Sequence, residues 1–176
     1  INEGPSDLKV DVITTMPNRY HSLNLSALQY EDTSKVSINR IDLPKHKSGM
    51  FDQAKAFILF SFMVRKLIKK KNWDIVIATS SRLRTASLGT WVAKQINSKI
   101  YLDVRDLFTD TISNIFAKKY LYILMPLLYK LEKWTFQSAD KLNVVSAGFL
   151  DYIKIIAPNL SPSTYTNGVD EMFLKK

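Results

Sequence analysis

Four ionisable residues cluster where a short apolar segment of the chain ends: Asp103, Arg105, Asp106 and Asp110. The residues from 100 to 104 are largely apolar and predict a buried strand, so the charges lie at or just past its carboxyl end. Open α/β sheets bind their ligands at that edge. Two interpretations follow: an arginine–carboxylate pair that fixes a loop, or a functional site.

Residue types in this segment restrict its chemistry. Asp103 and Asp106 could act as an acid–base pair, but the positive charge of Arg105 favours the ionised carboxylate, which favours a base or an orienting role over a general acid. The sequence has no cysteine and only two histidines, His21 and His46. A thiolate nucleophile and a cysteine-based metal site are therefore excluded, and only two residues could serve in histidine-centred catalysis.

Three other polar segments lie after predicted strands or before predicted helices, where they could bind an anion or a sugar. Each also has a plain structural interpretation: a turn, a basic surface loop, or a helix cap. The residues concerned are Asn18 and Arg19, then Lys45, His46 and Lys47, then Ser80, Ser81 and Arg82.

The basic charge of the chain is concentrated. The formal net charge is +9, and residues 45–71 contain eight Lys and Arg against the single acid Asp52, a local balance of +7. Such an excess favours an anionic partner, whether nucleic acid, phosphate or a membrane surface, without selecting among them.

Apolar segments with strand and helix spacing alternate along the chain, and a β-α alternation predicts an α/β fold with a mainly parallel sheet and helices on both faces. We expect strands over 8–15, 35–43, 73–78, 100–104 and 142–145, and helices over 51–70, about 82–95, 115–136 and 147–156, with Ser80 or Ser81 capping the second helix.

The predicted helix over 115–136 is unusually apolar on both faces. Its run from Tyr120 to Tyr129 is ten residues long, whereas a membrane span needs about twenty. Lysines near both ends and Trp134 are typical of a helix lying in a membrane interface. The alternative is a helix buried against another domain.

Short motifs along the chain, taken in order, resemble the amino-terminal domain of glycosyltransferase family 4, in the branch that assembles bacterial O-antigen and capsule. They cover nearly the whole chain and gain specificity from their order and spacing. The motifs are Val12–Asn18, Asp74–Ala78, Leu102–Leu107, Ala139–Asp140, Val144–Ser146 and Asn167–Asp170 with Phe173.

The resemblance implies one half of a GT-B glycosyltransferase, in which two Rossmann-like domains face each other across a cleft. Residues 1–166 would form the acceptor-binding domain and residues 167–176 the start of the interdomain linker. We expect the first strand with its glycine loop, and the carboxyl-terminal donor-binding domain with the paired-glutamate motif, to lie outside this chain. The family retains the anomeric configuration and requires neither a metal nor another cofactor.

The resemblance also implies roles for particular residues. Arg105 and Asp106 match the catalytic loop, where many relatives carry a histidine, and Asn167 with Gly168 matches a donor-binding segment. The expected donor is a UDP- or GDP-linked sugar, and the expected acceptor is a saccharide on a polyprenyl diphosphate. The acceptor-binding residues would be the polar segments named above: Asn18, Arg19, Lys45, His46, Lys47, Ser80, Ser81 and Arg82.

The enzyme would work in the cytoplasm, on the inner face of the bacterial plasma membrane, through the 115–136 helix. Two alternatives from other classes remain. One is a nucleic-acid-binding α/β module using the basic residues 65–71, although aromatic residues do not interleave them and we do not expect a nucleic-acid partner. The other is a non-catalytic membrane-docking domain.

Overall fold

The chain divides into two compact units, residues 1–70 and residues 71–176, which we call the amino-terminal and carboxyl-terminal units. The structure is a computed structural model. It describes residues 5, 7–17, 27–44, 50–69, 71–80, 82–107 and 118–168, with residues 50, 51, 80 and 118–124 described for their backbone only.

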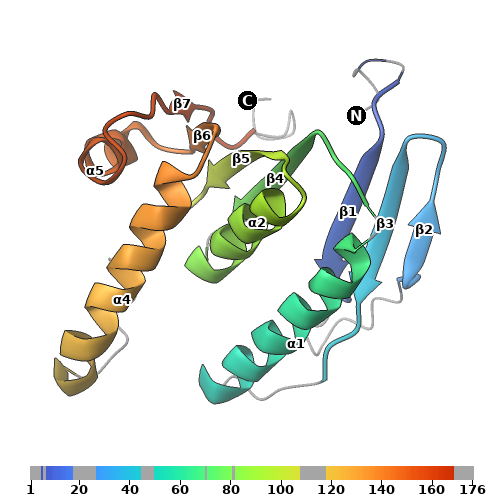
Figure 1. The fold of residues 1–176 in the computed structure, drawn as a ribbon, viewed down its shortest axis with the longest axis horizontal. Helices are drawn as coiled ribbons and strands as arrows, with labels where there is room; N and C mark the ends of the chain where they lie inside the picture. Colours follow the sequence, from blue (N-terminus) through green and yellow to red (C-terminus); the bar gives the residue numbers. More distant parts are fainter. Residues whose placement is uncertain are drawn as a thin grey trace, which may run out of the picture. The chain divides into compact units, whose positions relative to one another are not determined.

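The amino-terminal unit contains a small mixed sheet and one long helix (Figure 1). Strands β1 and β3 pair in parallel, and the short β2 pairs antiparallel to β3, giving the order β1-β3-β2. An ion pair of 2.5 Å between Arg40 and Glu31 joins β3 to β2. The elements are β1 (Val10–Thr15), β2 (Tyr30–Asp32), β3 (Val36–Ile41) and α1 (Met50–Ile68).

The carboxyl-terminal unit is built on four parallel strands in the order β4-β5-β6-β7. Helices alternate with the strands along the chain and flank this sheet (Figure 1). The elements are β4 (Ile75–Ser80), α2 (Leu83–Gln95), β5 (Lys99–Val104), α4 (Lys118–Gln137), β6 (Lys141–Val144), the 3₁₀ turn η1 (Ala147–Phe149), α5 (Leu150–Ile156) and β7 (Ser163–Thr164).

One face of this sheet forms the core. Alternate residues of a strand point to opposite faces, and on β5 the alternate residues Ile100, Leu102 and Val104 are almost completely buried. They belong to a single apolar cluster that also contains Leu142 and Val144 of β6 and residues of the described helices, namely Ala86 and Ala93 of α2, Phe136 of α4, and Ile153 and Ile156 of α5.

Helix α2 lies against the sheet because Gly89 has no side chain. A Cβ built at Gly89 would stand 2.5 Å from the Cβ of Ala78 on β4, which is closer than carbon atoms pack. On its other side α2 meets α4 through a buried hydrogen bond of 2.8 Å between the hydroxyls of Ser87 and Thr135. The small residues of α2 thus set its distance from both neighbours.

The expectation of a Rossmann-like α/β fold with a mainly parallel sheet is confirmed, and the expected strands and helices agree with the observed ones to within a few residues. Two strands were not expected. β2 is three residues long and β7 two, and segments this short carry too little pattern to be recognised. The expected domain boundary at residue 166 stays a prediction.

The expected cap of α2 is wrong. Ser80 is the last residue of β4, so it cannot be the residue before the helix. The residue preceding α2 is Arg82, whose backbone is extended and whose side chain makes no capping hydrogen bond. The strand continues two residues further than the apolar run Ile75–Ala78, because Thr79 and Ser80 complete the pairing with Asp103 and Val104.

Candidate functional site

Three polar residues form a row across neighbouring strands of the carboxyl-terminal unit. The parallel register places Thr79 of β4 beside Asp103 of β5, and Asp103 beside Asn143 of β6. All three lie near the carboxyl ends of their strands, on the face opposite the apolar core. The row is therefore at the sheet edge where ligand sites of α/β proteins form.

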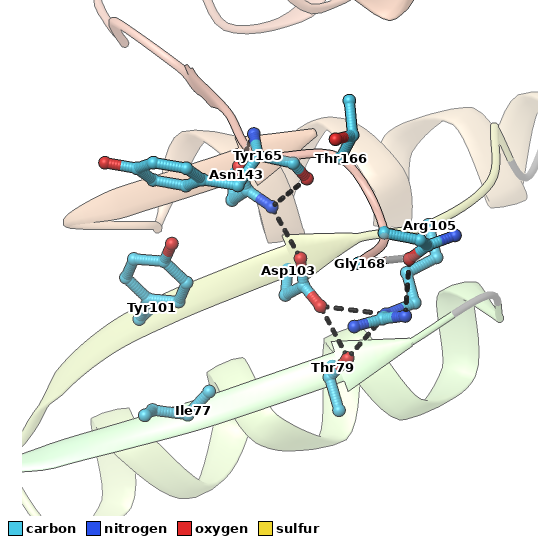
Figure 2. A pocket seen from close by; sticks show the side chains of 10 residues that line it. Ile77, Thr79, Tyr101, Asp103, Arg105, Asn143, Tyr165, Thr166 and Gly168 are labelled. Atoms are coloured by element: carbon cyan, nitrogen blue, oxygen red, sulfur yellow. Dashed lines mark hydrogen bonds and ion pairs between the residues drawn. The ribbon is translucent and has the colours of Figure 1, made fainter. Parts of the chain in front are cut away.

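Asp103 is the centre of a hydrogen-bond network (Figure 2). Its Oδ1 accepts a bond of 2.7 Å from the Asn143 amide, and its Oδ2 accepts one of 2.7 Å from the Thr79 hydroxyl. Oδ2 also accepts a charge-assisted bond of 2.9 Å from Nε of Arg105. Both carboxylate oxygens are thus occupied by neighbours within the protein.

These contacts decide the charge state of Asp103. Partial burial by itself would raise its pKa, but the hydrogen bonds from Asn143, Thr79 and Arg105 and the positive charge of Arg105 outweigh that effect. The pKa of Asp103 is held below its ordinary value, so the group is an anion at neutral pH. Such a carboxylate is a poor proton acceptor and is better suited to orienting its partners.

The main partner that Asp103 orients is Arg105. Nε of this guanidinium also lies 3.1 Å from the Thr79 hydroxyl, and its Nη1 donates a bond of 2.9 Å to Oδ1 of Asn167. The side chain stays 50% exposed, so a ligand can reach it. A guanidinium fixed at one edge and accessible at the other is a suitable group for binding a phosphate or a carboxylate.

Asn143 positions the segment that follows β7. Its Oδ1 accepts a bond of 2.8 Å from the backbone N–H of Tyr165, while its amide lies 3.4 Å from the Tyr165 carbonyl oxygen. The same side chain therefore contacts both Asp103 and this segment, and it is almost completely buried. In this way the row on the sheet is linked to the residues leading to Asn167.

The row and this segment enclose an open pocket with a cavity volume of about 590 Å³. Figure 2 shows Tyr101 and Tyr165 on one side of the Asp103 network and Arg105 on the other. The lining residues are Ile77, Thr79, Tyr101, Asp103, Arg105, Asn143, Tyr165, Thr166, Asn167 and Gly168.

Tyr101, on the aromatic side of the pocket, remains uncharged. Partial burial raises the pKa of Tyr101, and the negative charge of Asp103 and the neighbouring Tyr165 raise it further. Its hydroxyl is therefore neutral at physiological pH and able to donate a hydrogen bond. The pocket thus combines the ion pair of Arg105 and Asp103, hydroxyl and amide groups, and the apolar surfaces of two tyrosines and an isoleucine.

The sequence-predicted site residues fall into three groups. Arg105, Asn167 and Gly168 line one pocket together. Asp106 is half-buried and is not among the described residues that line the pocket. Of the remaining acceptor residues, Arg82 is exposed before α2 and does not line the pocket. Only the backbone of Ser80 is described, and the others lie outside the described residues: Asn18, Arg19, Lys45, His46, Lys47 and Ser81.

Arg82 acts on a second arginine at the start of α2. Burial lowers the pKa of nearby Arg84, and the like charge of Arg82 lowers it further. The like charges of the two arginines at the start of α2 therefore act unfavourably on each other.

Thr79, Asn143 and Tyr165 are site residues that the sequence did not identify. Thr79 and Asn143 each follow an apolar residue of their strand and lie within two residues of its carboxyl end. Asp103 has the same placement. A polar residue at this place in three consecutive parallel strands was a usable signal, since such residues meet at one edge of the sheet.

Comparison with models of known protein families and with curated proteins finds no match to this chain. Within the described ranges, no group of three His, Cys, Asp or Glu side chains is arranged to hold a metal ion. None of the helices described is both long and apolar enough to span a membrane. The site is therefore characterised by its geometry alone: an open pocket with an oriented arginine at the carboxyl edge of a parallel sheet.

Proposed function

We propose that this chain is the acceptor-binding half of a retaining glycosyltransferase that moves a sugar from a UDP- or GDP-linked donor to a polyprenyl-diphosphate-linked saccharide in bacterial surface polysaccharide synthesis. One observation carries the proposal. The pocket at the carboxyl edge of the four-stranded sheet contains an accessible guanidinium, Arg105, held in one orientation by Asp103 and Asn167.

The guanidinium of Arg105, which is more exposed than the paired carboxylate of Asp103, supports an anionic ligand. A diphosphate offers oxygens that accept charge-assisted hydrogen bonds from arginine, and such bonds are among the strongest that a neutral-pH site can form. The carboxylate of Asp103 offsets part of this attraction, but it contacts only Nε of Arg105, and the guanidinium stays half exposed to a ligand. The role of Asp103 in the proposal is to position Arg105.

The other lining groups support a saccharide. Sugar rings have apolar C–H faces and hydroxyl edges, so they bind where flat aromatic surfaces stand beside amides and hydroxyls. Tyr101 and Tyr165 supply the aromatic surfaces, and Thr166 and Asn167 add polar groups to the lining of the pocket. The proposed ligand therefore places its diphosphate near Arg105 and a sugar ring near the tyrosines.

The catalytic step in this proposal needs a partner domain. Asn167 and Gly168 lead out of the pocket, and we propose that they approach the nucleotide sugar bound by a carboxyl-terminal donor domain. Arg105 then contacts the reacting diphosphate or sugar, in keeping with the family resemblance. Asp106 retains the catalytic role implied by that resemblance as a separate proposal, since the pocket geometry supports only Arg105. No metal or other cofactor is part of this proposal.

A lipid-linked acceptor requires access to a membrane, and we propose that the 115–136 helix supplies it on the cytoplasmic face of the plasma membrane. The exposed side of the described part of α4 supports this, because Leu127 is 64% exposed and Trp134 37% exposed, and Lys130 lies between them on the same helix face. The opposite side belongs to the core through Phe136.

A binding experiment tests the proposal directly. Titration of the chain with a short-chain prenyl diphosphate saccharide, followed by calorimetry, is expected to give saturable binding that weakens about tenfold or more in Arg105→Gln, because a charge-assisted bond is lost. Lys133→Gln removes the same charge from an exposed position on α4 and is expected to bind normally. Equal affinity in both variants would refute the proposed site.

A transfer assay tests the enzyme class. The full-length protein, including the proposed donor domain, is expected to glycosylate a lipid-linked acceptor, and Arg105→Gln is expected to lose most of that activity. The same assay with Asp106→Ala decides the separate proposal for Asp106. Robust transfer by the 176-residue chain alone would contradict the need for a second domain.

A further inference from the structure

Helix α1 of the amino-terminal unit has an exposed face that the proposed function does not use. It contains four basic and three apolar residues, which we call the α1 stripe: Lys55, Ile58, Leu59, Phe62, Arg65, Lys66 and Lys69, the last of which directly follows the helix. The spacing of three and four residues places all seven on one side of a helix with 3.6 residues per turn.

The apolar members of the α1 stripe are open to solvent. Ile58 is 68% exposed, Phe62 53% and Leu59 36%. Val64 and Ile68 of the same helix are 5% exposed, so α1 has a separate buried side. Ile58 and Phe62 therefore lie outside the buried side formed by Val64 and Ile68, and the exposure of their apolar side chains to water is unfavourable.

Basic residues surround these apolar side chains. The ammonium group of Lys66 lies 4.6 Å from the centre of the Phe62 ring, and Lys55, Arg65 and Lys69 are exposed along the same side. The only acidic residue of α1 is Asp52, in the first turn. From residue 53 to residue 69 the charge is entirely positive.

From these observations we propose that the α1 stripe binds the surface of an anionic lipid bilayer, with Ile58, Leu59 and Phe62 inserted among the acyl chains and the lysines and arginine beside the lipid phosphates. Helices that lie in a membrane interface combine an apolar strip with Lys and Arg in this way, and basic residues add attraction to anionic lipids.

A bilayer fits the α1 stripe better than a nucleic acid does. Phosphates of either would attract the four cations, but only a bilayer offers an apolar phase for Ile58 and Leu59. Nucleic-acid surfaces gain from aromatic residues that stack on bases, and Phe62, already covered by Lys66, is the only aromatic residue in the stripe.

The test is flotation of the whole 176-residue chain with vesicles, without any sugar substrate. Equal parts of phosphatidylglycerol and phosphatidylcholine are expected to carry the chain to the top of the gradient, and phosphatidylcholine alone is expected to carry little. The double variant Ile58→Ser/Phe62→Ser is expected to bind the anionic vesicles at least about tenfold more weakly, because two inserted apolar side chains are lost.

Matched controls distinguish vesicle binding by the α1 stripe from nonspecific binding through other exposed apolar or charged residues. Ile155→Ser removes an apolar residue that is 74% exposed on α5 and is expected to leave binding unchanged. Lys55→Gln/Arg65→Gln/Lys66→Gln is expected to weaken binding far more than Lys94→Gln/Lys99→Gln/Lys141→Gln, which removes the same charge from exposed positions in the carboxyl-terminal unit.

Three results would overturn the inference: no flotation of the wild-type chain, wild-type flotation of the Ile58→Ser/Phe62→Ser variant, or equal losses in the two triple variants. Duplex DNA binding that is lost in the α1 triple variant, with no vesicle binding, would assign the stripe to nucleic acid instead. All these readouts are independent of sugar transfer, so they can fail while the pocket proposal stands, and the reverse.

Discussion

The two faces of the four-stranded sheet differ although the same strands build both. On β5, Ile100, Leu102 and Val104 are buried in the core, while Tyr101 and Asp103 between them line the pocket. On β4, Ala78 is buried and Ile77 is 70% exposed. Because side chains alternate along a strand, a single segment supplies both the stability of the unit and its chemistry.

The apolar face explains how the site keeps its geometry. The residues of the pocket need no packing of their own to be held in place, because the apolar face fixes the backbone of each strand. The hydrogen bonds among Thr79, Asp103 and Asn143 then fix the side chains. Stability and binding should therefore respond separately to substitutions on the two faces.

The largest expected effect is on the apolar face. Leu102→Ala removes a side chain with no exposed surface and should lower the free energy of unfolding by about 2–5 kcal/mol, because it leaves a cavity in the core. Urea unfolding followed by circular dichroism measures this. Tyr101→Ala, one residue away on the open face, should cost much less, and similar losses in the two variants would contradict the difference between the faces.

A second effect concerns the distance between the core face and α2. Gly89→Ala brings a methyl group to 2.5 Å from the Cβ of Ala78, so α2 must shift, and the free energy of unfolding should fall by about 1–3 kcal/mol. Gly148→Ala, whose Cβ meets only ordinary contacts, is the control. Adding Ala78→Gly to Gly89→Ala should restore part of the loss, and no recovery would show that the close contact is not the cause.

Asp103 on the open face should have a smaller effect, and one that depends on pH. Asp103→Asn removes the anion that accepts bonds from Thr79 and Arg105 and should cost about 1–2 kcal/mol of unfolding free energy at neutral pH. The pKa of Asp103 is lowered in the folded state, so its stabilisation is present above the unfolded-state pKa and lost as the pH falls through the folded-state pKa.

The measurement for Asp103 is therefore a pH series of unfolding free energies for the wild type and Asp103→Asn. The difference between them should be constant near neutral pH and should shrink as the pH falls below about 4. A difference that stays the same at acid pH would mean that the ionised carboxylate is not what stabilises the network.

The smallest effect is expected at the most exposed apolar residue of the sheet. Ile77→Thr keeps a β-branched side chain on β4 and changes a residue that is 70% exposed, so the free energy of unfolding should change by no more than about 0.5 kcal/mol. Val104→Thr on the buried face is the matched comparison and should cost clearly more. A large loss at Ile77 would mean that the open face also contributes to the core.

Much of the fold could be predicted from the sequence because local patterns determine it. The buried strand near Ile100 and the helix ending at Gln95 lie where apolar spacing indicated them. The short strands β2 and β7 form through pairing with β3 and β6, and no local pattern of three or two residues could reveal them. The prediction of the cap of α2 is wrong for a related reason, since pairing with β5 extends β4 through Ser80.

The candidate site was only partly predictable. Arg105, Asn167 and Gly168 were singled out and do line one pocket. Asp103 and Asp106 lie three positions apart. The family resemblance favoured Asp106 as the catalytic residue, whereas Asp103 is the one that lines the pocket. Position along the chain cannot separate them, because what matters is that Asp103 lies within β5 on the open face.

Composition and local periodicity were enough to predict the α/β class and the order of the main elements, and they reveal a concentration of charge after Leu102 and along residues 45–71. These properties depend on composition and on periodicity within one segment. The set of polar residues that form the site depends on the folded sheet, because Thr79, Asp103 and Asn143 meet through the register of three strands that are distant in the chain. Strand register is set by the packing of the opposite, apolar face, and no single segment contains that information.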